Sequence, residues 1–504
     1  MTAGLGAGAG RPTPPFAFAL RPDAVGSRIG REVVTDRAFV DRLGGACAEV
    51  VTDDAALIEA GRDWWPLSVS WGVAGDVPAR PGVIARPRTA AEVAAALAVC
   101  NSAGMPVTPA AGRSGVCGGS VPVFGGVALD LTGLVGIVGV DDRSLTVDVR
   151  AGTFGDLFEA QLGEEHGLTL GHWPQSIALS TVGGWLACRS AGQCSTRYGK
   201  IEDMVVGLEV ALADGRLIRT GGHAPRAATG PDLTQLFVGS EGTLGVITEA
   251  RLRVRPRPDG EHRAAYGFGS FTDGLDACRR ILRRGATPAV LRLYDPAESG
   301  RTFSLPDRAT LIVADEGDPA LVTAVAAVVA DECKRAETLD PALAGQWLAQ
   351  RSQIPPLESI ARDGLIADTI EIAAPWAALP AIYQSGIAAL EAIEETLLAS
   401  AHQSHAYLDG ACLYFTFAGR PASDGPGDTY YRRAWDAVMS VTLAHGGAVS
   451  HHHGVGINRG RHLARALGSA FDVLGRVKAA LDPQGILNPG KLGLASPFGD
   501  APWP

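Results

Sequence analysis

Three segments rich in small residues lie close together in the chain, and they constrain its fold more than any other feature. They read PAAGRSGVCGGS at 109–120, PQSIALSTVGGWLACRSAGQCSTRYG at 174–199 and GSEGTLGVIT at 239–248. Glycine lets a backbone approach a ligand closely and adopt positive φ, so that successive N–H groups can converge on phosphate oxygens. One such segment alone also suits a structural turn. Three of them indicate one long polar ligand that spans all three, and a dinucleotide is the natural candidate.

The residues around these segments alternate between short strands and helices. The expected elements, in chain order, are a strand at 82–85, a helix at 89–103 and strands at 107–109, 127–131 and 145–149. Thr89, with Glu92 three residues later, is a helix-capping signal. Short strands separated by glycine loops and a helix predict an α+β domain that ends at about Pro258.

A second region with longer amphipathic helices follows this domain. The expected elements are helices near 272–284, 318–337 and 378–401, strands at 289–294, 310–314 and 411–417, and a final helix at 460–482. The chain therefore divides into a flexible leader at 1–30, a helical segment at 31–77, domains at 78–258 and 259–445, and a C-terminal segment at 446–504. The GLGAGAG stretch at 4–10 belongs to the leader, because no strand precedes it and a Pro-rich segment follows it.

Composition excludes several classes of protein. The 44 basic and 54 acidic residues give a net charge of −10, which argues against a general nucleic-acid surface. The eight cysteines show no CxxC pair, as is typical of a reduced, intracellular protein and not of a disulfide scaffold or a zinc site. The N-terminus lacks the charged region of a secretory signal, and no apolar run approaches the roughly 18–20 residues of a membrane span. We therefore expect a cytoplasmic protein with no transmembrane segment.

The segment SHHHGVG at 450–456 places three of the 11 histidines in a row. In an extended segment neighbouring side chains point to opposite faces, so His451 and His453 are expected on one side and His452 on the other. That alternation argues against a zinc site made of these three residues alone. An imidazole, with an ordinary pKa of about 6.5, can hold or release a proton at neutral pH, which favours acid–base work. A packing or orienting role for single members of the run remains open.

These motifs, in this order, resemble the vanillyl-alcohol oxidase / p-cresol methylhydroxylase superfamily of FAD enzymes. One branch, alkylglycerone-phosphate synthase (alkyl-dihydroxyacetonephosphate synthase), is similar in detail: the matching motifs are STVGGW at 180–185, YGKIEDMV at 198–205, GSEGTLGVITEA at 239–250 and SHHHGVG at 450–456. GSEGTLG marks the wider superfamily, and SHHHGVG is the more discriminating motif. The resemblance covers about residues 45–492. It implies a two-lobed FAD-binding domain of the p-cresol methylhydroxylase type at 78–258, an α+β cap that places the substrate at 259–445, and a C-terminal segment that returns to the FAD domain.

The same resemblance implies which residues contact FAD, with the pyrophosphate on the 110–120 loop. The implied cofactor-binding residues are Pro109, Ala110, Gly112, Arg113, Ser114, Gly115, Val116, Gln175, Ser176, Ser180, Thr181, Gly183, Gly184, Ser190, Ala191, Glu241, Gly242, Val246 and Ile247. Many relatives attach FAD covalently through a His or a Cys. No His lies in the 109–120 loop, so non-covalent FAD is expected, with Cys117 and Cys188 as small buried apolar residues.

Catalytic residues also follow from the resemblance. The three histidines 451–453, together with Tyr414 in DGACLYF at 409–415, are implied to move protons. Arg292, in the apolar stretch PAVLRLYD at 288–295, is implied to handle the acyl carboxylate, which a bidentate guanidinium suits. A surface salt bridge for Arg292 and a structural role for Tyr414 are the alternatives.

The synthase reaction implies an FAD-dependent enzyme without net redox change. An acyl-dihydroxyacetone phosphate loses a C1 proton, flavin N5 forms an adduct with that carbon, and a long-chain alcohol replaces the fatty acid. The substrate is then a small or lipid-like molecule. The synthases usually continue with a basic stretch after GVG, whereas this chain reads INRGR at 457–461. Arg459 or Arg461 is expected to keep phosphate recognition, unless the substrate has changed.

The alternative is an FAD-dependent oxidase or dehydrogenase of a 2-hydroxy acid or another small alcohol. Those relatives have GEHGIG where this chain has HHHGVG, and they carry an HxxGDGNxH metal-binding element. The nearest stretch, HAYLDGACLY at 405–414, lacks the second histidine, so no metal is expected. A catalytically inactive binding protein is a third class, disfavoured because the cofactor and catalytic positions are all filled. The sequence leaves a homodimer open.

Overall fold

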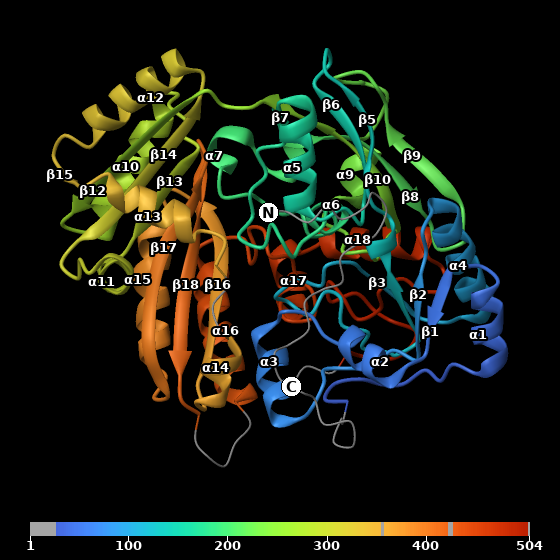
Figure 1. Ribbon diagram of the computed structural model, residues 1–504. Coiled ribbons are helices and arrows are strands. Elements are labelled where there is room, and N and C mark those ends of the chain that lie inside the picture. Colours follow the sequence, from blue (N-terminus) through green and yellow to red (C-terminus); the bar gives the residue numbers. More distant parts are fainter. Residues whose placement is uncertain (1–26, 354–356, 422–426, 502–504) are drawn as a thin grey trace.

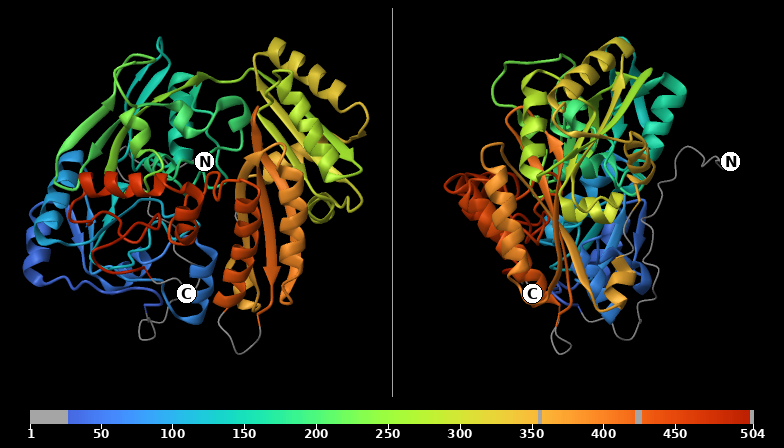
Figure 2. Two further views of the ribbon diagram at one scale, coloured as in Figure 1. Left: turned by 180° about the vertical axis from the view of Figure 1, so that it is seen from behind. Right: turned by 90° about the vertical axis from the view of Figure 1, so that its left-hand side faces the viewer.

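The computed structural model of the chain describes residues 27–353, 357–421 and 427–501. Two lobes lie side by side, and the second contains a tall sheet whose strands run along the boundary between them (Figure 1). The last helices of the chain return to the back of the first lobe (Figure 2). None of the described helices is both long and apolar enough to cross a lipid bilayer.

The end of the predicted leader differs from expectation. Residues 1–26, which include GLGAGAG, lie outside the described part of the chain. Ser27 forms a β-bridge with Val77, and the Ile29 side chain is buried. The guanidinium of Arg28 donates to the carboxylate of Asp428 in the second lobe at 2.7 Å. Residues 27–30 are therefore part of the packed structure and not of a flexible tail.

The first lobe begins with a sheet in the order β1-β2-β4-β3, in which β2, β4 and β3 run parallel. Its strands are β1 (Glu49–Val51), β2 (Val83–Arg86), β3 (Val107–Ala110) and β4 (Val127–Asp130). Its helices are α1 (Arg37–Gly44), α2 (Asp54–Ala60), α3 (Pro66–Ala74), α4 (Ala90–Ala103) and the short η1 (Leu131–Gly133). The Thr89 hydroxyl accepts the N–H of Glu92 and caps α4, as the sequence predicted.

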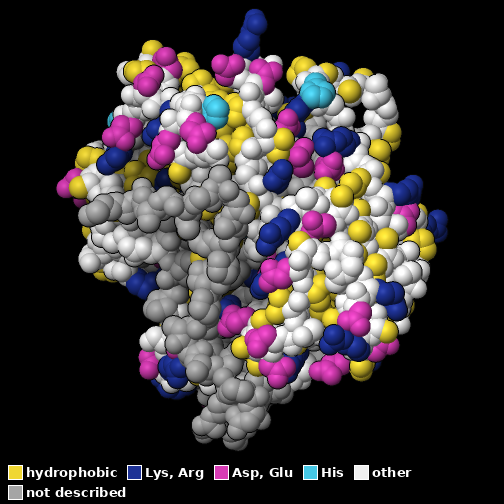
Figure 3. Space-filling view, turned by 45° about the vertical axis from the view of Figure 1, so that its right-hand side comes forward, with side chains coloured by type: hydrophobic (Ala, Val, Ile, Leu, Met, Phe, Trp, Pro, Cys, Tyr) yellow, Lys and Arg dark blue, Asp and Glu magenta, His cyan; other side chains and the backbone are white. Residues whose placement is uncertain are grey.

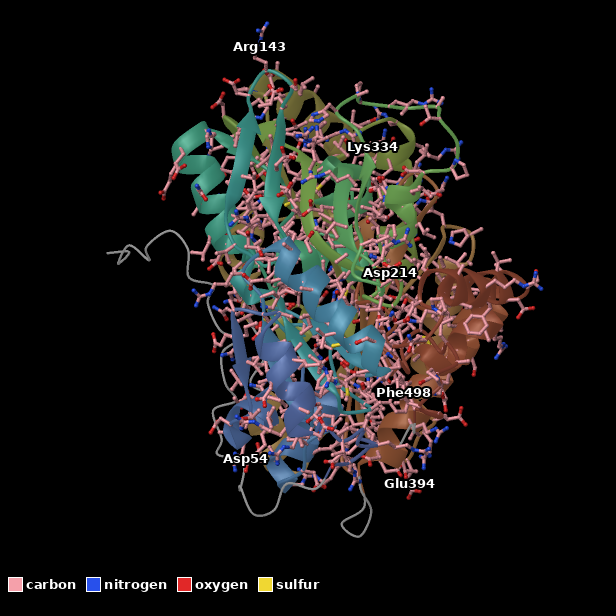
Figure 4. The ribbon with its side chains drawn as sticks, turned by 90° about the vertical axis from the view of Figure 1, so that its right-hand side faces the viewer. Asp54, Arg143, Asp214, Lys334, Glu394 and Phe498 are labelled. Carbon is pink, nitrogen blue, oxygen red and sulfur yellow. The ribbon has the colours of Figure 1, made fainter. Side chains whose placement is uncertain are left out.

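An antiparallel sheet in the order β5-β6-β10-β8-β9 forms the other half of the first lobe. Its strands are β5 (Ile137–Asp141), β6 (Thr146–Arg150), β8 (Val205–Ala211), β9 (Leu217–Gly221) and β10 (Val246–Arg253), with β7 (Leu168–Thr169) and β11 (Arg255–Pro256) forming a separate pair. Its helices are α5 (Gly155–His166), α6 (Val182–Cys188), α7 (Ser195–Tyr198), α8 (Ile201–Met204) and α9 (Leu233–Phe237). In Figure 4, Arg143 at the tip of the β5–β6 hairpin and Asp54 at the start of α2 mark opposite ends of this lobe.

The second lobe is built on one antiparallel sheet in the order β15-β12-β14-β13-β17-β18-β16. Its strands are β12 (Gly260–Phe268), β13 (Val290–Tyr294), β14 (Ala309–Gly317), β15 (Glu337–Leu339), β16 (Ile366–Pro375), β17 (Thr396–Ala406) and β18 (Gly410–Gly419). The helices are α10 (Phe271–Arg283), α11 (Pro296–Phe303), α12 (Pro319–Glu332), α13 (Ala342–Gln350), α14 (Leu357–Arg362), α15 (Leu379–Glu391) and α16 (Asp428–Ala444), followed by α17 (Gly460–Leu467) and α18 (Ala470–Leu481). On the surface drawn in Figure 3, acidic, basic and hydrophobic side chains are interspersed.

Several sequence predictions of secondary structure were wrong in part. The segment 31–77, expected to be helical, also contains strand β1, which pairs with β2. The helix expected at 378–401 ends at Glu391, because the next residues pair with β18 as strand β17. The helix expected at 460–482 is interrupted at Gly468, whose φ is 54°. The 174–199 segment, for which no helix was expected, contains α6 and α7, and the Thr181 hydroxyl caps α6. Local composition could not show these tertiary effects.

Candidate active site

The three small-residue segments meet in the first lobe, as the sequence predicted. A Cβ added to Gly112 would lie 2.0 Å from the carbonyl oxygen of Leu179, so the 109–120 segment, here called the cofactor loop, lies directly on the second segment. The N–H of Gly239 donates to the carbonyl of Leu186 at 2.8 Å, which joins the second segment to the third. Backbone packed this closely needs the small residues that the sequence shows.

The C-terminal segment returns to the same place through Glu241. Its carboxylate accepts the N–H groups of Val455 and Gly456 at 2.5 and 2.8 Å, directly after the histidine run. The side-chain amide of Asn488 donates to the carbonyls of Glu241 and Gly119 at 2.6 and 3.0 Å. Glu241 thus ties the GVG turn to the cofactor loop, a role that sequence reasoning did not assign to it.

Arg113 of the cofactor loop could receive an anion. Its backbone is in the left-handed region with φ 48°, and its side chain is largely buried. The Nε and Nη2 atoms have no hydrogen-bond partner among the described residues, and the nearest carboxylate, that of Asp130, lies 3.9 Å from Nη1. Buried guanidinium nitrogens without partners are costly, and a diphosphate would satisfy them.

Other residues expected at the cofactor have partners within the protein. The Ser180 hydroxyl accepts from the Trp185 indole at 2.7 Å, and the Ser190 hydroxyl lies 3.0 Å from Nε2 of His172. The Gln175 amide donates to the carbonyl of Gln353. The remaining expected residues lie on the same elements: Pro109 and Ala110 in β3, Ser114, Gly115 and Val116 in the cofactor loop, Ser176 before α6, Gly183 and Gly184 in α6, Ala191 after α6, Gly242 in the third segment, and Val246 and Ile247 in β10.

A buried acid–base pair beneath the cofactor loop was not predicted from the sequence. Lys491, in the NPGKL turn, is fully buried and donates to the carbonyl of Val121 at 2.7 Å. Burial lowers its pKa to about 7 and raises the pKa of the nearby Asp63 to about 7. The one available signal was the rarity of lysine, since the chain has only four.

Strand pairing in the second-lobe sheet brings together the side chains on the other side of the site. Tyr294 of β13 lies opposite His402 of β17, His402 opposite Tyr414 of β18, and Tyr414 opposite Glu371 of β16. We call these four residues the lateral row. The His402 and Tyr414 rings stack with centroids 4.8 Å apart and an interplanar angle of 12°. A register shift between Gln403 and His405 brings His405 opposite Cys412, next to the row.

The histidine run meets the lateral row at Tyr414. The Tyr414 hydroxyl lies 2.6 Å from Nε2 of His452 and 3.0 Å from Nε2 of His453, and Nδ1 of His452 lies 2.8 Å from Nδ1 of His451. The run is a bend and not an extended strand, with Gly454 and Gly456 at φ 82° and 52°. The expected alternation of the three rings was therefore wrong, because His452 and His453 converge on one hydroxyl.

Glu371, which sequence reasoning missed, holds the run in place. Its fully buried carboxylate accepts the N–H groups of His451 and His453, the latter at 2.9 Å, and pairs with the Arg459 guanidinium at 2.7 Å. Burial opposes its ionisation, but the charge of Arg459 and the adjacent imidazoles lower the pKa of Glu371 to about 2. Only the strand pairing of β16 with β18 brings this residue to the site.

Arg292 lies inside the site and not in a surface salt bridge. Its Nη2 is 2.5 Å from Nε2 of His402, and its Nε donates to the Tyr294 hydroxyl at 2.7 Å. The Nδ1 atom of His402 is 2.9 Å from the Glu298 carboxylate, so a buried acid–imidazole pair orients the guanidinium. Nη1 has no hydrogen-bond partner among the residues that the structure describes.

The imidazoles of the site are neutral at physiological pH. Burial lowers the pKa of His451 and of His453 to about 4. Burial, together with repulsion from neighbouring imidazoles and arginines, lowers the pKa of His452 and of His405 well below the ordinary value. Burial also raises the pKa of the Tyr414 hydroxyl well above its ordinary value. The three histidines and Tyr414 are therefore uncharged, and each hydrogen bond among them can form with either partner as the donor.

One group of side chains has the composition of a metal site. His405, Cys412, His451 and His452 each offer one ligand atom, and these atoms lie within 4.8 Å of one another. Imidazole and thiolate are donors that zinc accepts. Nε2 of His405 and Nε2 of His451 have no hydrogen-bond partner among the described residues, but both nitrogens of His452 are hydrogen-bonded, so a cation would have to replace one of the His452 contacts. The group is therefore capable of metal binding without being arranged around an ion.

The contacts of Arg459 and Arg461 differ from those expected of residues that bind a substrate phosphate. Arg459 is fully buried; it pairs with Glu371 and donates to the carbonyl of Val449 at 2.7 Å. Arg461 donates to the Asp436 carboxylate from Nε and Nη2 at 3.0 and 2.7 Å. These contacts favour structural roles for both residues, because their charges are already compensated.

Comparison with known proteins identifies the chain as similar to FAD-binding proteins. Two family models match: "FAD binding domain" over residues 81–221, and "FAD linked oxidases, C-terminal domain" over residues 257–492. The chain is 30% identical over 434 residues to an uncharacterized FAD-linked oxidoreductase, YgcU, of Escherichia coli O157:H7, covering 82% of this chain and 89% of the relative. It is 28% identical over 457 residues to an alkyldihydroxyacetonephosphate synthase of Dictyostelium discoideum, covering 83% of this chain and 74% of the relative.

Solved structures agree on the fold. A crystallised alkyldihydroxyacetonephosphate synthase superposes with a TM-score of 0.77 at 24% identity, covering 94% of this chain and 88% of that one. FAD is the cofactor, and the partnerless guanidinium nitrogens of Arg113 suit its diphosphate. The chain belongs to the FAD-linked oxidases and is an FAD-dependent enzyme.

Proposed function

We propose that this enzyme is an alkyl transferase of the alkylglycerone-phosphate synthase type. It exchanges the acyl group of an acyl-dihydroxyacetone phosphate for a long-chain alcohol. The observation that carries the proposal is the Tyr414 hydroxyl shared by His452 and His453, with Arg292 held on the same sheet. FAD, when bound, supplies an electron sink at the flavin ring. Residues 78–258 would hold FAD, and residues 259–445 would act as the cap.

Proton transfer falls to Tyr414 and His452. The neutral imidazole of His452 can accept a substrate proton at Nε2 through the Tyr414 hydroxyl, which is 2.6 Å away. Its depressed pKa makes it a weak base in the free enzyme. The phosphate charge of a bound acyl-dihydroxyacetone phosphate would raise that pKa, because nearby negative charge favours the protonated imidazole. Substrate binding would thus activate the base.

Arg292 would stabilise the departing carboxylate. His402 and Tyr294 fix two sides of its guanidinium, and Nη1 remains for a ligand. A preoriented guanidinium loses little side-chain entropy when it binds a carboxylate. The fatty acid that leaves during alkyl exchange carries that group.

FAD would be held without a covalent bond. The Cys117 thiol is buried, and burial raises its pKa well above the ordinary value, so it is not a nucleophile. Burial raises the pKa of Cys188 in the same way. Acid precipitation of the purified yellow protein should leave all flavin in the supernatant, and flavin that stays with the pellet would refute this point.

A second candidate is oxidation of a 2-hydroxy acid. The position of Arg292 also favours this oxidation, because its guanidinium, next to His402, would bind the carboxylate of a 2-hydroxy acid. The similarity to an FAD-linked oxidoreductase also supports it. In that reaction the substrate loses two electrons to FAD, whereas alkyl exchange leaves FAD oxidised at the end.

One anaerobic experiment separates the two reactions. Oxidised enzyme is mixed without oxygen with palmitoyl-dihydroxyacetone phosphate and hexadecanol, or in parallel with D-lactate or glycolate. We expect an ether-linked product and released palmitate while the flavin absorbance ends unchanged. Lasting flavin bleaching by a hydroxy acid, with no ether product, would replace the synthase proposal by the oxidase. Tyr430→Phe, which removes a buried hydroxyl outside the site, is the matched control.

A further inference from the structure

Three polar side chains of the second lobe form a chain that ends at the proposed carboxylate site. The carboxylate of Glu298, in the first turn of α11, lies 2.9 Å from Nδ1 of His402 on β17. Nε2 of the same ring lies 2.5 Å from Nη2 of Arg292 on β13. The side chains of Glu298 and His402 are almost fully buried, whereas Arg292 is partly exposed. The chain therefore leads from the interior to a guanidinium that a ligand can reach.

The contacts of His402 determine where its ring carries a proton. A guanidinium can only donate, so Nε2 of His402 must be the acceptor in the contact with Arg292. The ring proton then lies on Nδ1, and the Glu298 carboxylate accepts it. A charged imidazolium would turn an N–H group toward the N–H groups of Arg292. Burial and the charge of Arg292 also lower the pKa of His402, which agrees with a neutral ring.

Other side chains cover most of the Arg292 guanidinium. Its Nε donates to the Tyr294 hydroxyl at 2.7 Å, and the ring centroids of Tyr294 and Trp347 lie 5.4 and 5.6 Å from its central carbon. Trp347 comes from α13 and is buried. Nη1 has no hydrogen-bond partner among the residues for which the structure gives positions. The end of the guanidinium that carries Nη1 is therefore left for an anion.

We propose that Glu298 is a positioning residue for carboxylate recognition by Arg292, and that it acts through His402. This role rests on the proposed function of Arg292, which both candidate reactions share. Glu298 keeps the ring proton on Nδ1, so that Nε2 offers an acceptor to Nη2 and leaves Nη1 for the ligand. No bond to hydrogen is broken in this chain. A guanidinium oriented in advance loses less freedom when it binds a carboxylate.

An ion pair with Arg301 is the competing explanation for Glu298. The Arg301 guanidinium lies 3.6 Å from the Glu298 carboxylate, and its side chain is 42% exposed. Exposed ion pairs contribute little to stability, and the contact of Glu298 with buried His402 is shorter. Arg301→Met removes this ion pair and leaves the His402 contact in place. It is therefore the matched control for substitution of Glu298.

The sign of the effect on ligand binding separates positioning from simple electrostatics. If Glu298 acted only through its charge, removing that charge beside a cation should tighten the binding of an anion. If Glu298 orients Arg292 through His402, removing the acceptor should weaken binding. Glu298→Met removes both the charge and the acceptor. Glu298→Gln removes the charge but keeps an oxygen that can accept the Nδ1 proton.

Calorimetric titration of the FAD-loaded full chain with carboxylates tests the role without turnover. The probes are decanoate, a fatty acid, and oxamate, an unreactive relative of the 2-hydroxy acids. For a probe that binds, the Kd should rise about 10-fold or more in Glu298→Met, the effect of one lost hydrogen bond involving a charged group. The Kd should stay within about threefold of wild type in Glu298→Gln and Arg301→Met.

Three binding results would overturn the role of Glu298. The first is unchanged or tighter binding in Glu298→Met, and the second is an equal loss of affinity in Arg301→Met. The third is a wild type that binds neither decanoate nor oxamate, because the carboxylate site itself would then be absent.

Histidine ¹⁵N resonances of the wild-type, FAD-loaded chain test the ring directly, even if Glu298→Met fails to fold. The signals of His402 are those missing from His402→Asn. We expect a neutral ring with its proton on Nδ1. A proton on Nε2, or on both nitrogens, would contradict the positioning role.

The proposed alkyl exchange stands or falls separately. A wild type without alkyl exchange, but with the expected carboxylate affinities and ring proton, would reject the synthase proposal and keep the role of Glu298. Normal alkyl exchange together with unchanged carboxylate affinity in Glu298→Met would keep the synthase proposal and reject that role.

Discussion

The two sides of this active site are built in different ways. On the first lobe, the cofactor loop and the two other small-residue segments offer mainly backbone, and each is continuous in sequence. On the second lobe, the lateral row and the histidine run offer side chains from β13, β17, β18, β16 and the loop after α16. The first side is local in sequence, and in the proposed function it would bind the cofactor. The second side depends on strand register, and in the proposed function it would transfer protons.

If the proposed roles hold, this difference predicts that cofactor binding and proton transfer can be changed separately by substitution. A binding surface made mainly of backbone should lose part of its affinity, but not all, when one side chain is removed, because its N–H groups remain. A side-chain cluster of four linked rings does not, because each member determines the hydrogen-bond direction of the next. The following variants test that separation, from the largest expected effect to the smallest.

Tyr414→Phe should have the largest effect. It removes the hydroxyl that His452 and His453 share, so kcat should fall about 100- to 1,000-fold, the range of general acid–base catalysis. The flavin absorption spectrum and the Kd for FAD should stay close to wild type. Stopped-flow turnover and flavin titration measure both quantities. A kcat within threefold of that of Tyr430→Phe would remove Tyr414 from the proposed chemistry.

Glu371→Gln should come next. The change leaves the buried Arg459 charge without its partner and loosens the histidine run, so the free energy of unfolding should fall by about 3 kcal/mol. kcat should fall about tenfold at temperatures where the variant is folded. Urea unfolding and steady-state kinetics are the measurements.

The matched control for Glu371→Gln is Glu159→Gln. Glu159 is also buried and accepts the backbone N–H groups of Leu170 and Gly171, but it pairs with no arginine and lies away from the histidine run. Burial raises its pKa to about 7, so the neutral amide should be tolerated with normal kcat. Equal losses of kcat in both variants would mean that Glu371 has no special relation to the run.

Arg113→Met should weaken FAD binding and do little else. Loss of a charged hydrogen-bond donor to the diphosphate should raise the Kd for FAD about 10- to 50-fold, while kcat at saturating FAD changes far less. Flavin fluorescence quenching gives the Kd. Arg143→Met, at an exposed hairpin tip of the same lobe (Figure 4), controls for the lost charge. An unchanged Kd in Arg113→Met would contradict the assignment of this residue to the diphosphate.

Acidification should produce the smallest effect, centred on the second lobe. The pKa of His451 and of His453 is about 4 in the folded protein and about 6.5 when unfolded. Their contribution to stability is therefore complete above pH 6.5 and is lost as the pH falls toward 4, because the unfolded chain binds protons first. Between pH 6.5 and 5.5 each should contribute roughly 1 kcal/mol to the loss. A doubly substituted His451→Asn, His453→Asn protein should show a flatter profile in urea unfolding, and an identical slope would contradict the shifts.

Much of the first lobe could be predicted from sequence because its signals are local. The α4 cap at Thr89, the cofactor loop after β3 and the meeting of three small-residue segments all depend on residues near one another in the chain. Helices α6 and α7 within the second segment were missed, because small residues there also suit short capped helices.

The second side could be predicted only as a set of residue types. Tyr414, Arg292 and the histidine run were identified through family resemblance, but Glu371 and His402 carry no motif of their own. They reach the site through the pairing of β16 and β17 with β18, and a register shift places His405 there. The alternation rule failed for the run because Gly454 and Gly456 bend it, so that two adjacent rings meet one hydroxyl.

A double-variant cycle with Arg113→Met and Tyr414→Phe tests most directly whether the two sides act separately. Both the Kd for FAD and kcat at saturating FAD are measured in the wild type, the two single variants and the double variant. The account predicts that the double variant has the Kd of Arg113→Met and the kcat of Tyr414→Phe, each within about threefold. A departure of tenfold or more in either quantity, about 1.4 kcal/mol of coupling, would contradict it.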